Sequence, residues 1–207
     1  MKTRNKALLT MVCAVLLVVA SVLGTMAYLT STAKVENTFT VGSVTISMDE
    51  TDVDNSTEDK ERDTENNYHL LPGHEYTKDP IIHVASTSEE CYLFVTVSNE
   101  IAAIEATGDT SVASQMEAKG WKTVEGQTDL YVYIGTAEGA SAPLAVKAND
   151  NIPVFKKIVI NGSVDNTTLA SYENKTITVN AYAVQKDGFE SKTASEIWNT
   201  TFGASEN

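Results

Sequence analysis

Zinc chemistry is the first possibility to consider, because the chain contains three histidines, His69, His74 and His83. His74 and Glu75 could begin the helical H-E-x-x-H motif, in which a second histidine follows four residues after the first. Lys78 occupies that position. An ammonium group cannot replace a neutral imidazole as a zinc ligand. We therefore expect ordinary loop and strand histidines and no zinc site.

Calcium chemistry is the second possibility. Residues 49–67 contain nine acidic and two basic residues, and Asp52, Asp54 and Ser56 occupy alternate positions, as ligands of an EF-hand loop do. The sixth position lacks the required glycine, and Asp63 replaces the twelfth-position glutamate. This segment predicts a mobile, solvated acidic loop that binds divalent cations loosely rather than a dedicated calcium site.

Covalent catalysis lacks a candidate nucleophile. No serine lies in a Gly-x-Ser-x-Gly elbow, and the glycines are too scattered to cradle a phosphate. Cys91 lies in an apolar strand pattern, where burial would raise its pKa and make the thiol unreactive. The prediction is a non-enzymatic protein with no catalytic residue, no metal ligand set and no cofactor.

The N-terminus has the pattern of an export signal. Three basic residues precede the apolar run of residues 7–23, and Thr25 and Ala27 supply the small residues that a signal peptidase requires. We predict that residues 1–27 are a signal peptide; Ser31 and Ala33 offer a weaker cleavage site. The alternative is an uncleaved membrane anchor, since 17 apolar residues lie at the short limit of a bilayer span.

The remaining chain would be acidic and without disulfides. Removing three of the 15 basic residues and none of the 28 acidic residues leaves a net charge of 12 − 28 = −16. Such a chain is not expected to bind nucleic acid. Cys91 would be the one remaining cysteine, because Cys13 lies in the signal. These features favour a protein secreted to the exterior of a Gram-positive bacterium.

Apolar residues alternate along most of the mature chain, which predicts β-strands. Val35, Phe39 and Val41 share one face, and the phase shifts by one residue after Gly42. Further strands are expected at residues 44–48, 81–85, 91–97, 130–134, 154–160 and 176–184, with short helices at 109–120 and 193–198. Both faces of strand 91–97 are apolar enough to be covered, whereas strand 176–184 places Ile177, Val179, Ala181 and Ala183 inward. The expected fold is mostly β, a jelly-roll-like two-sheet β-sandwich with two short helices, formed by residues 43–207 as one domain.

Three segments together resemble the TasA and camelysin family of secreted Gram-positive proteins. They are "GTMAYLTSTAKVENTFTVGSVTI", "LLPGHEYTKDPIIHV" leading into "CYLFVTV", and "ITVNAYAVQKDGF" before "IW". The signal junction is similar to signals processed by the dedicated SipW-type peptidase. The resemblance implies a jelly-roll subunit of biofilm matrix fibres, with the signal peptidase and an accessory matrix protein as further partners.

The resemblance also implies how copies assemble. After cleavage, residues 28–42 would donate a strand to the sheet of the next copy, giving a head-to-tail homopolymer. The positions that could serve are Tyr28, Leu29, Val35, Phe39 and Val41. Residues 35–41 could instead be the first strand of their own domain. Two other functions stay open: a camelysin-like surface metalloprotease and a monomeric surface adhesin or binding module.

Overall fold

The computed structural model describes residues 3–29, 42–55 and 61–203. The chain divides into two compact units, Met1–Val41 and Gly42–Asn207. The first contains helix α1 (Thr3–Leu29), whose large apolar side chains between Leu8 and Val19 are exposed. Among the described residues, no helix combines the length and the hydropathy that crossing a bilayer requires.

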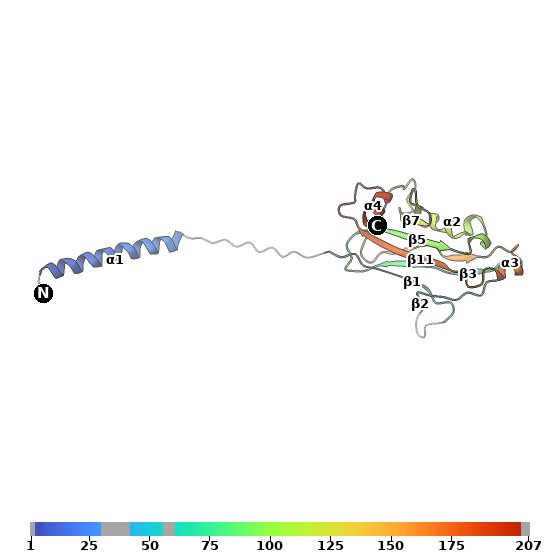
Figure 1. Cartoon of the computed structure of the whole chain (residues 1–207), viewed down its shortest axis with the longest axis horizontal. Helices are drawn as coiled ribbons and strands as arrows, with labels where there is room; N and C mark the ends of the chain where they lie inside the picture. Colours follow the sequence, from blue (N-terminus) through green and yellow to red (C-terminus); the bar gives the residue numbers. More distant parts are fainter. Residues whose placement is uncertain (1–2, 30–41, 56–60, 204–207) are drawn as a thin grey trace. The chain divides into compact units, whose positions relative to one another are not determined.

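The second unit consists mainly of antiparallel strands (Figure 1). The strands are β1 (Ile46–Thr51), β2 (Arg62–Asp63), β3 (Glu75–Thr77), β4 (Ile81–Val84), β5 (Cys91–Asn99), β6 (Trp121–Thr123), β7 (Leu130–Tyr133), β8 (Ala145–Val146), β9 (Asn151–Pro153), β10 (Lys157–Val159) and β11 (Ile177–Gln185). One sheet has the order β2-β1-β4-β9, another the order β11-β5-β7-β6 with β8 also paired to β5, and β10 pairs with β3. The prediction of a mostly β fold is confirmed.

The described helices are more numerous than the two expected in this unit. They are α2 (Val112–Ala118), α3 (Asn166–Ala170) and α4 (Ala194–Thr201), with 3₁₀ turns η1 (Ala102–Ile104) and η2 (Gly108–Thr110). The predicted capping box of α4 is confirmed, since the Thr193 side chain accepts from the Glu196 N–H and Glu196 reaches back to the Thr193 N–H. Ser111 caps α2, one residue after the positions expected to do so.

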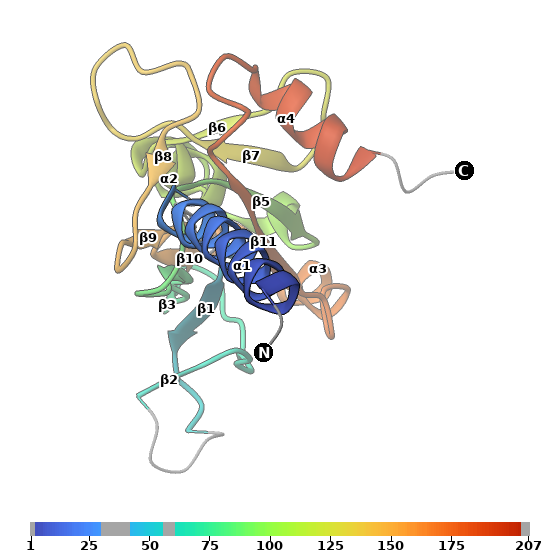
Figure 2. The same cartoon turned by 90° about the vertical axis from the view of Figure 1, so that its left-hand side faces the viewer.

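The core confirms that both faces of β5 are covered. Cys91, Leu93 and Val95 of β5 are fully buried against Ile82 and other residues of the β1–β4–β9 sheet. Tyr92 and Phe94 point to the opposite face, where α4 packs through Ile197 (Figures 1 and 2). Burying both faces of a strand explains its nearly continuous apolar sequence.

Two segment predictions need correction. The strand expected over 154–160 is confined to β10, because the N–H of Val154 still bonds to the Pro80 carbonyl next to β4, and pairing with β3 begins only at Lys157. The mobile loop expected over 49–67 is wrong for its described flanks: residues 49–51 complete β1, and Arg62 and Asp63 form β2. Ion pairs of Arg62 with Asp49 and Asp79 hold these flanks in place. Residues 56–60 lie outside the described residues.

Candidate functional site

The sheet containing β5 ends at β11, whose outer edge pairs with no described strand. On the inner edge, the Thr176 carbonyl accepts from the Glu100 N–H, and the Lys186 N–H donates to the Glu90 carbonyl. Backbone bonding alternates along an antiparallel pair, so the even-numbered residues of β11 bond to β5. The odd-numbered residues 177–183 therefore direct their backbone groups to the open edge.

Strand β1 has a second open edge. The Thr45 carbonyl accepts from the Ala85 N–H, which places the odd-numbered residues of β1 against β4. The even-numbered residues face the other way, where Glu50 pairs with β2. No described strand pairs with this edge at Ile46 and Met48. Their N–H and C=O groups are consequently available to a further strand.

A groove separates the two open edges. Ile46 and Met48 of β1 and Val179 and Ala181 of β11 line it, and its volume is about 370 Å³. These four side chains pack against the main core but stay half-buried, whereas the equivalent positions of β5 are fully buried. Half-buried apolar side chains beside unpaired backbone are the surface that an added strand would cover.

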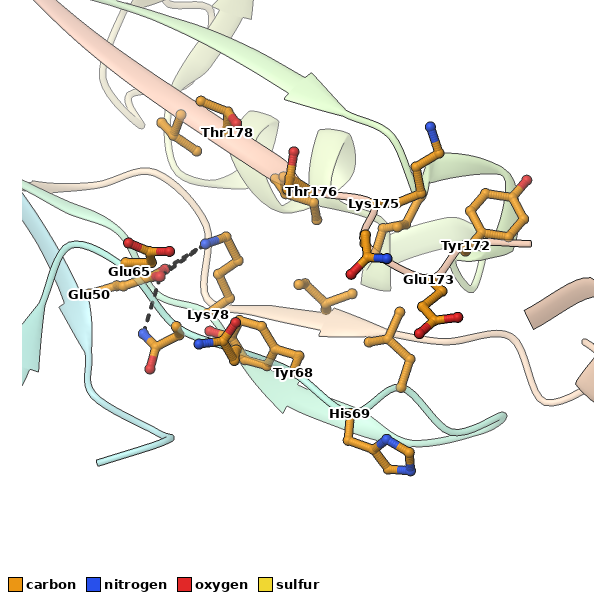
Figure 3. A pocket seen from close by; sticks show the side chains of 18 of the residues that line it. Glu50, Glu65, Tyr68, His69, Lys78, Tyr172, Glu173, Lys175, Thr176 and Thr178 are labelled. Atoms are coloured by element: carbon orange, nitrogen blue, oxygen red, sulfur yellow. Dashed lines mark hydrogen bonds and ion pairs between the residues drawn. The ribbon is translucent and has the colours of Figure 1, made fainter. Parts of the chain in front are cut away.

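The groove widens beyond Met48 and Val179 into a cleft of about 1120 Å³. Figure 3 shows Glu50, Tyr68 and Lys78 on one wall, with Thr176 and Thr178 of β11 on the other. The apolar part of its lining comes from Leu70, Ile101, Ile158, Leu169 and Ile177, which form or adjoin a small satellite core. The cleft and groove together run along residues 176–182, which include the first two thirds of β11.

A buried ion pair forms one wall of the cleft. Lys78 Nζ lies 2.8 Å from Glu50 Oε2, and the Glu50 residue is only 5% exposed (Figure 3). The same ammonium lies 5.9 Å from the centroid of the Tyr68 ring, within the range of a cation–π contact. The Tyr68 hydroxyl donates to the Thr77 carbonyl. Burial and the surrounding carboxylates, beginning with Glu50, raise the pKa of Tyr68 well above its usual range.

Arg62 links β2 to the Thr51 end of β1. Its guanidinium pairs with the carboxylates of Asp49 and Asp79 and also donates to the backbone carbonyls of both residues. Burial favours the neutral forms of Asp49 and Asp79. Hydrogen bonds outweigh that effect and lower the pKa of each: for Asp49 they come from Arg62 and His83, and for Asp79 from the Thr51 N–H and Arg62. We call Arg62, Asp49 and Asp79 the arginine clasp.

The arginine clasp predicts a loss of stability in acid. A carboxyl whose folded pKa is depressed adds stability above its unfolded pKa, about 3.9 for Asp, and loses it as pH falls through the folded pKa. Arg62→Gln is expected to lower the free energy of unfolding by about 2–3 kcal/mol at pH 7. The difference between wild type and variant should shrink below about pH 4. Urea unfolding across pH 2–7 measures both effects.

Lys175→Gln is the matched control for that experiment, because it breaks an exposed ion pair with Glu100. Exposed pairs of this kind contribute less than about 1 kcal/mol. Equal losses from the two variants, or an Arg62→Gln difference that stays constant down to pH 2, would contradict a stabilising role for the clasp.

Three carboxylates near β2 could hold a divalent cation. Oxygen atoms of Asp52, Asp54 and Asp63 lie within 4.8 Å of one another. The structure thus brings together two residues of the alternating pattern and the one at the twelfth position, while Ser56 lies outside the described residues. Asp54 also accepts from the N–H of Asn67, which ties this segment to the chain that follows β2.

The other candidates for chemistry do not converge. Within the described ranges, none of the three histidines joins a group of three potential metal ligands. His83 lies in β4, where Nδ1 hydrogen-bonds to the Asn151 amide oxygen and Nε2 lies 3.1 Å from Asp49 Oδ2. Cys91 is completely buried, and burial, with a smaller contribution from Asp150, raises its pKa to about 11. The buried thiol expected from the sequence is confirmed.

The residues expected to act in export and assembly fall largely outside the described residues. Val35, Phe39 and Val41 lie in the segment 30–41, of which nothing is described. Thr25, Ala27, Tyr28 and Leu29 form the last part of α1. The donor-strand interpretation treats Tyr28 and Leu29 as extended, but in the uncleaved chain they are helical. Sequence reasoning missed the groove between β1 and β11, because open strand edges depend on pairing between distant segments.

No family model, no curated protein and no solved structure matches this chain.

Proposed function

We propose that this chain is a secreted, acidic, non-enzymatic subunit of extracellular matrix fibres, of the kind to which the TasA and camelysin resemblance points. In this proposal residues 1–27 are removed by a signal peptidase, and the body is a jelly-roll-like sandwich. Residues 28–42 of each copy then donate a strand to the next copy. The observation that carries the proposal is the groove between the open edges of β1 and β11.

The groove supports this function because its unpaired backbone and half-buried apolar side chains are suited to binding an extended peptide. An added strand would satisfy the unpaired backbone groups at the open edge of β11 and cover Ile46, Met48, Val179 and Ala181. Residues 35–41 have the alternating apolar pattern that such a position requires. Because donor and acceptor are different surfaces, the contact does not close on itself, and repeated association gives a filament.

Negative-stain electron microscopy of residues 28–207 beside residues 42–207, at rising concentration, tests this function. Both chains keep the second compact unit whole. Filaments are expected from the longer chain alone. Filaments from both chains would remove the donor segment from the proposal, and monomers from both would overturn self-assembly.

A monomeric binding module is the second candidate, favoured by the size of the cleft beside Tyr68 and Lys78. Monomers that bind a glycan or a protein after signal removal would support it. A camelysin-like metalloprotease is the remaining alternative, and it predicts stoichiometric zinc and chelator-sensitive cleavage of casein.

A further inference from the structure

We propose that the groove accepts the incoming strand in one direction, antiparallel to β11. The donated residue Val41 then lies opposite Ile177, Phe39 opposite Val179, and Val35 opposite Ala183 of the neighbouring copy. This inference rests on the proposed function, because it specifies the partner of the same groove. It adds the polarity and the register of the contact between copies.

The polarity follows from where each chain enters its own body. The Ser43 carbonyl accepts from the Glu89 N–H, and the next residue, Glu90, accepts from the N–H of Lys186, just after β11 ends. The donor segment therefore leaves the body at the Gln185 end of β11. The opposite end of the groove, at Ile177, opens into the cleft.

The direction of insertion decides whether assembly stays open. In an open chain of copies, the donating body lies beyond the Ile177 end, away from the end where the acceptor's own segment leaves. The donated strand then has Val41 at Ile177 and runs antiparallel to β11. A parallel strand would place the donating body at the Gln185 end of the acceptor's β11, which is also where the acceptor's own segment leaves. Two copies could then exchange segments reciprocally and close as a dimer.

The side-chain pattern fits the antiparallel register. Directly opposed residues of antiparallel strands point to the same face. The odd-numbered donor residues would join Ile177 and Val179 on the inner face, and Phe39 would lie where the groove widens into the cleft. On the outer face Thr40 would lie opposite Thr178, and Thr38 opposite Asn180; both β11 residues are exposed. Apolar residues thus meet apolar residues, and polar residues meet polar ones.

The same register sets the spacing of a cross-link. The odd-numbered residues of β11 supply the free backbone bonds, so Thr40 and Thr178 would form a non-hydrogen-bonded pair. Cα atoms of such a pair are about 4.5 Å apart, within the range of a disulfide. The test is the double variant Thr40→Cys and Thr178→Cys in residues 28–207, oxidised after assembly and examined on a non-reducing denaturing gel. Cys91 is buried and does not compete.

The matched control is Glu36→Cys with Thr178→Cys, which pairs these positions only in a parallel strand. The expected result is a ladder of covalent oligomers from the first variant and none from the control, with filaments from both. Filaments whose ladder appears only in the control, or in neither variant, overturn the polarity and leave the fibre function standing. A disulfide within one chain, from either variant, shows that the segment fills its own groove and overturns the proposal. Without filaments or inter-chain links from either variant, both proposals fail.

Discussion

Phe39→Asp is expected to raise the concentration at which residues 28–207 form filaments by about 100-fold or more. Burying a phenylalanine side chain stabilises an interface by roughly 1.5–3 kcal/mol, and each 1.4 kcal/mol is a tenfold change in affinity. A carboxylate placed in the same apolar groove loses that gain and adds the cost of removing its charge from water. Sedimentation of filaments over a concentration series measures the shift.

Thr40→Asp is the control for this variant, because it adds the same charge one residue away on the opposite face of an extended strand. It should change the filament-forming concentration much less than Phe39→Asp. The unfolding of both variants as monomers should match the parent chain. Equal effects of the two substitutions would mean that net charge, rather than entry of Phe39 into a groove, controls assembly.

Trp121→Ala is expected to produce the largest loss of monomer stability, about 3–5 kcal/mol. The side chain is 1% exposed, lies within the main core and contacts the Tyr133 ring at a centroid distance of 5.3 Å. Its indole N–H donates to the Pro153 carbonyl, 2.9 Å away, and so links β6 to β9 in the other sheet. Domains are typically stable by about 5–15 kcal/mol, so the variant should be close to unfolding.

Lys122→Ala is the matched control for Trp121→Ala, since Lys122 is the next residue of β6 and is exposed. Denaturant unfolding should give a change within about 0.5 kcal/mol for this surface position. A loss below about 1 kcal/mol for Trp121→Ala would contradict the view that the indole joins the two sheets.

The parts of this fold that sequence predicted are those with a long, regular period. The nine-residue strands β5 and β11 were predicted because their side chains alternate between two faces over a long segment. Helix α4 was predicted because Thr193 and Glu196 have the spacing of a capping box. The strands β3, β6, β8 and β9 have two or three residues each, too few for a period to emerge. Their positions are set by the partners against which they lie.

The arginine clasp escaped prediction for a different reason. A run of acidic residues is predicted to be solvated unless its positively charged partners are known. Here the partners are Arg62, which pairs with Asp49, and Lys78, which pairs with Glu50 although it lies 28 residues further along the chain. Arg62 was the signal within the run, since a cation among nine carboxylates has many partners to choose from. Which carboxylates it binds depends on the pairing of β2 with β1.

The buried thiol of Cys91 can report how often the strands around it separate. In a chain that lacks residues 1–27 it is the one cysteine, and it is the first residue of β5, paired on one side with β11 and on the other with β8. A thiol reagent can reach it only when these strands separate, so the rate of labelling measures the free energy of that separation. Because β11 is also the strand that we propose receives the donated segment, labelling in monomers and in filaments compares how firmly this sheet is held before and after assembly.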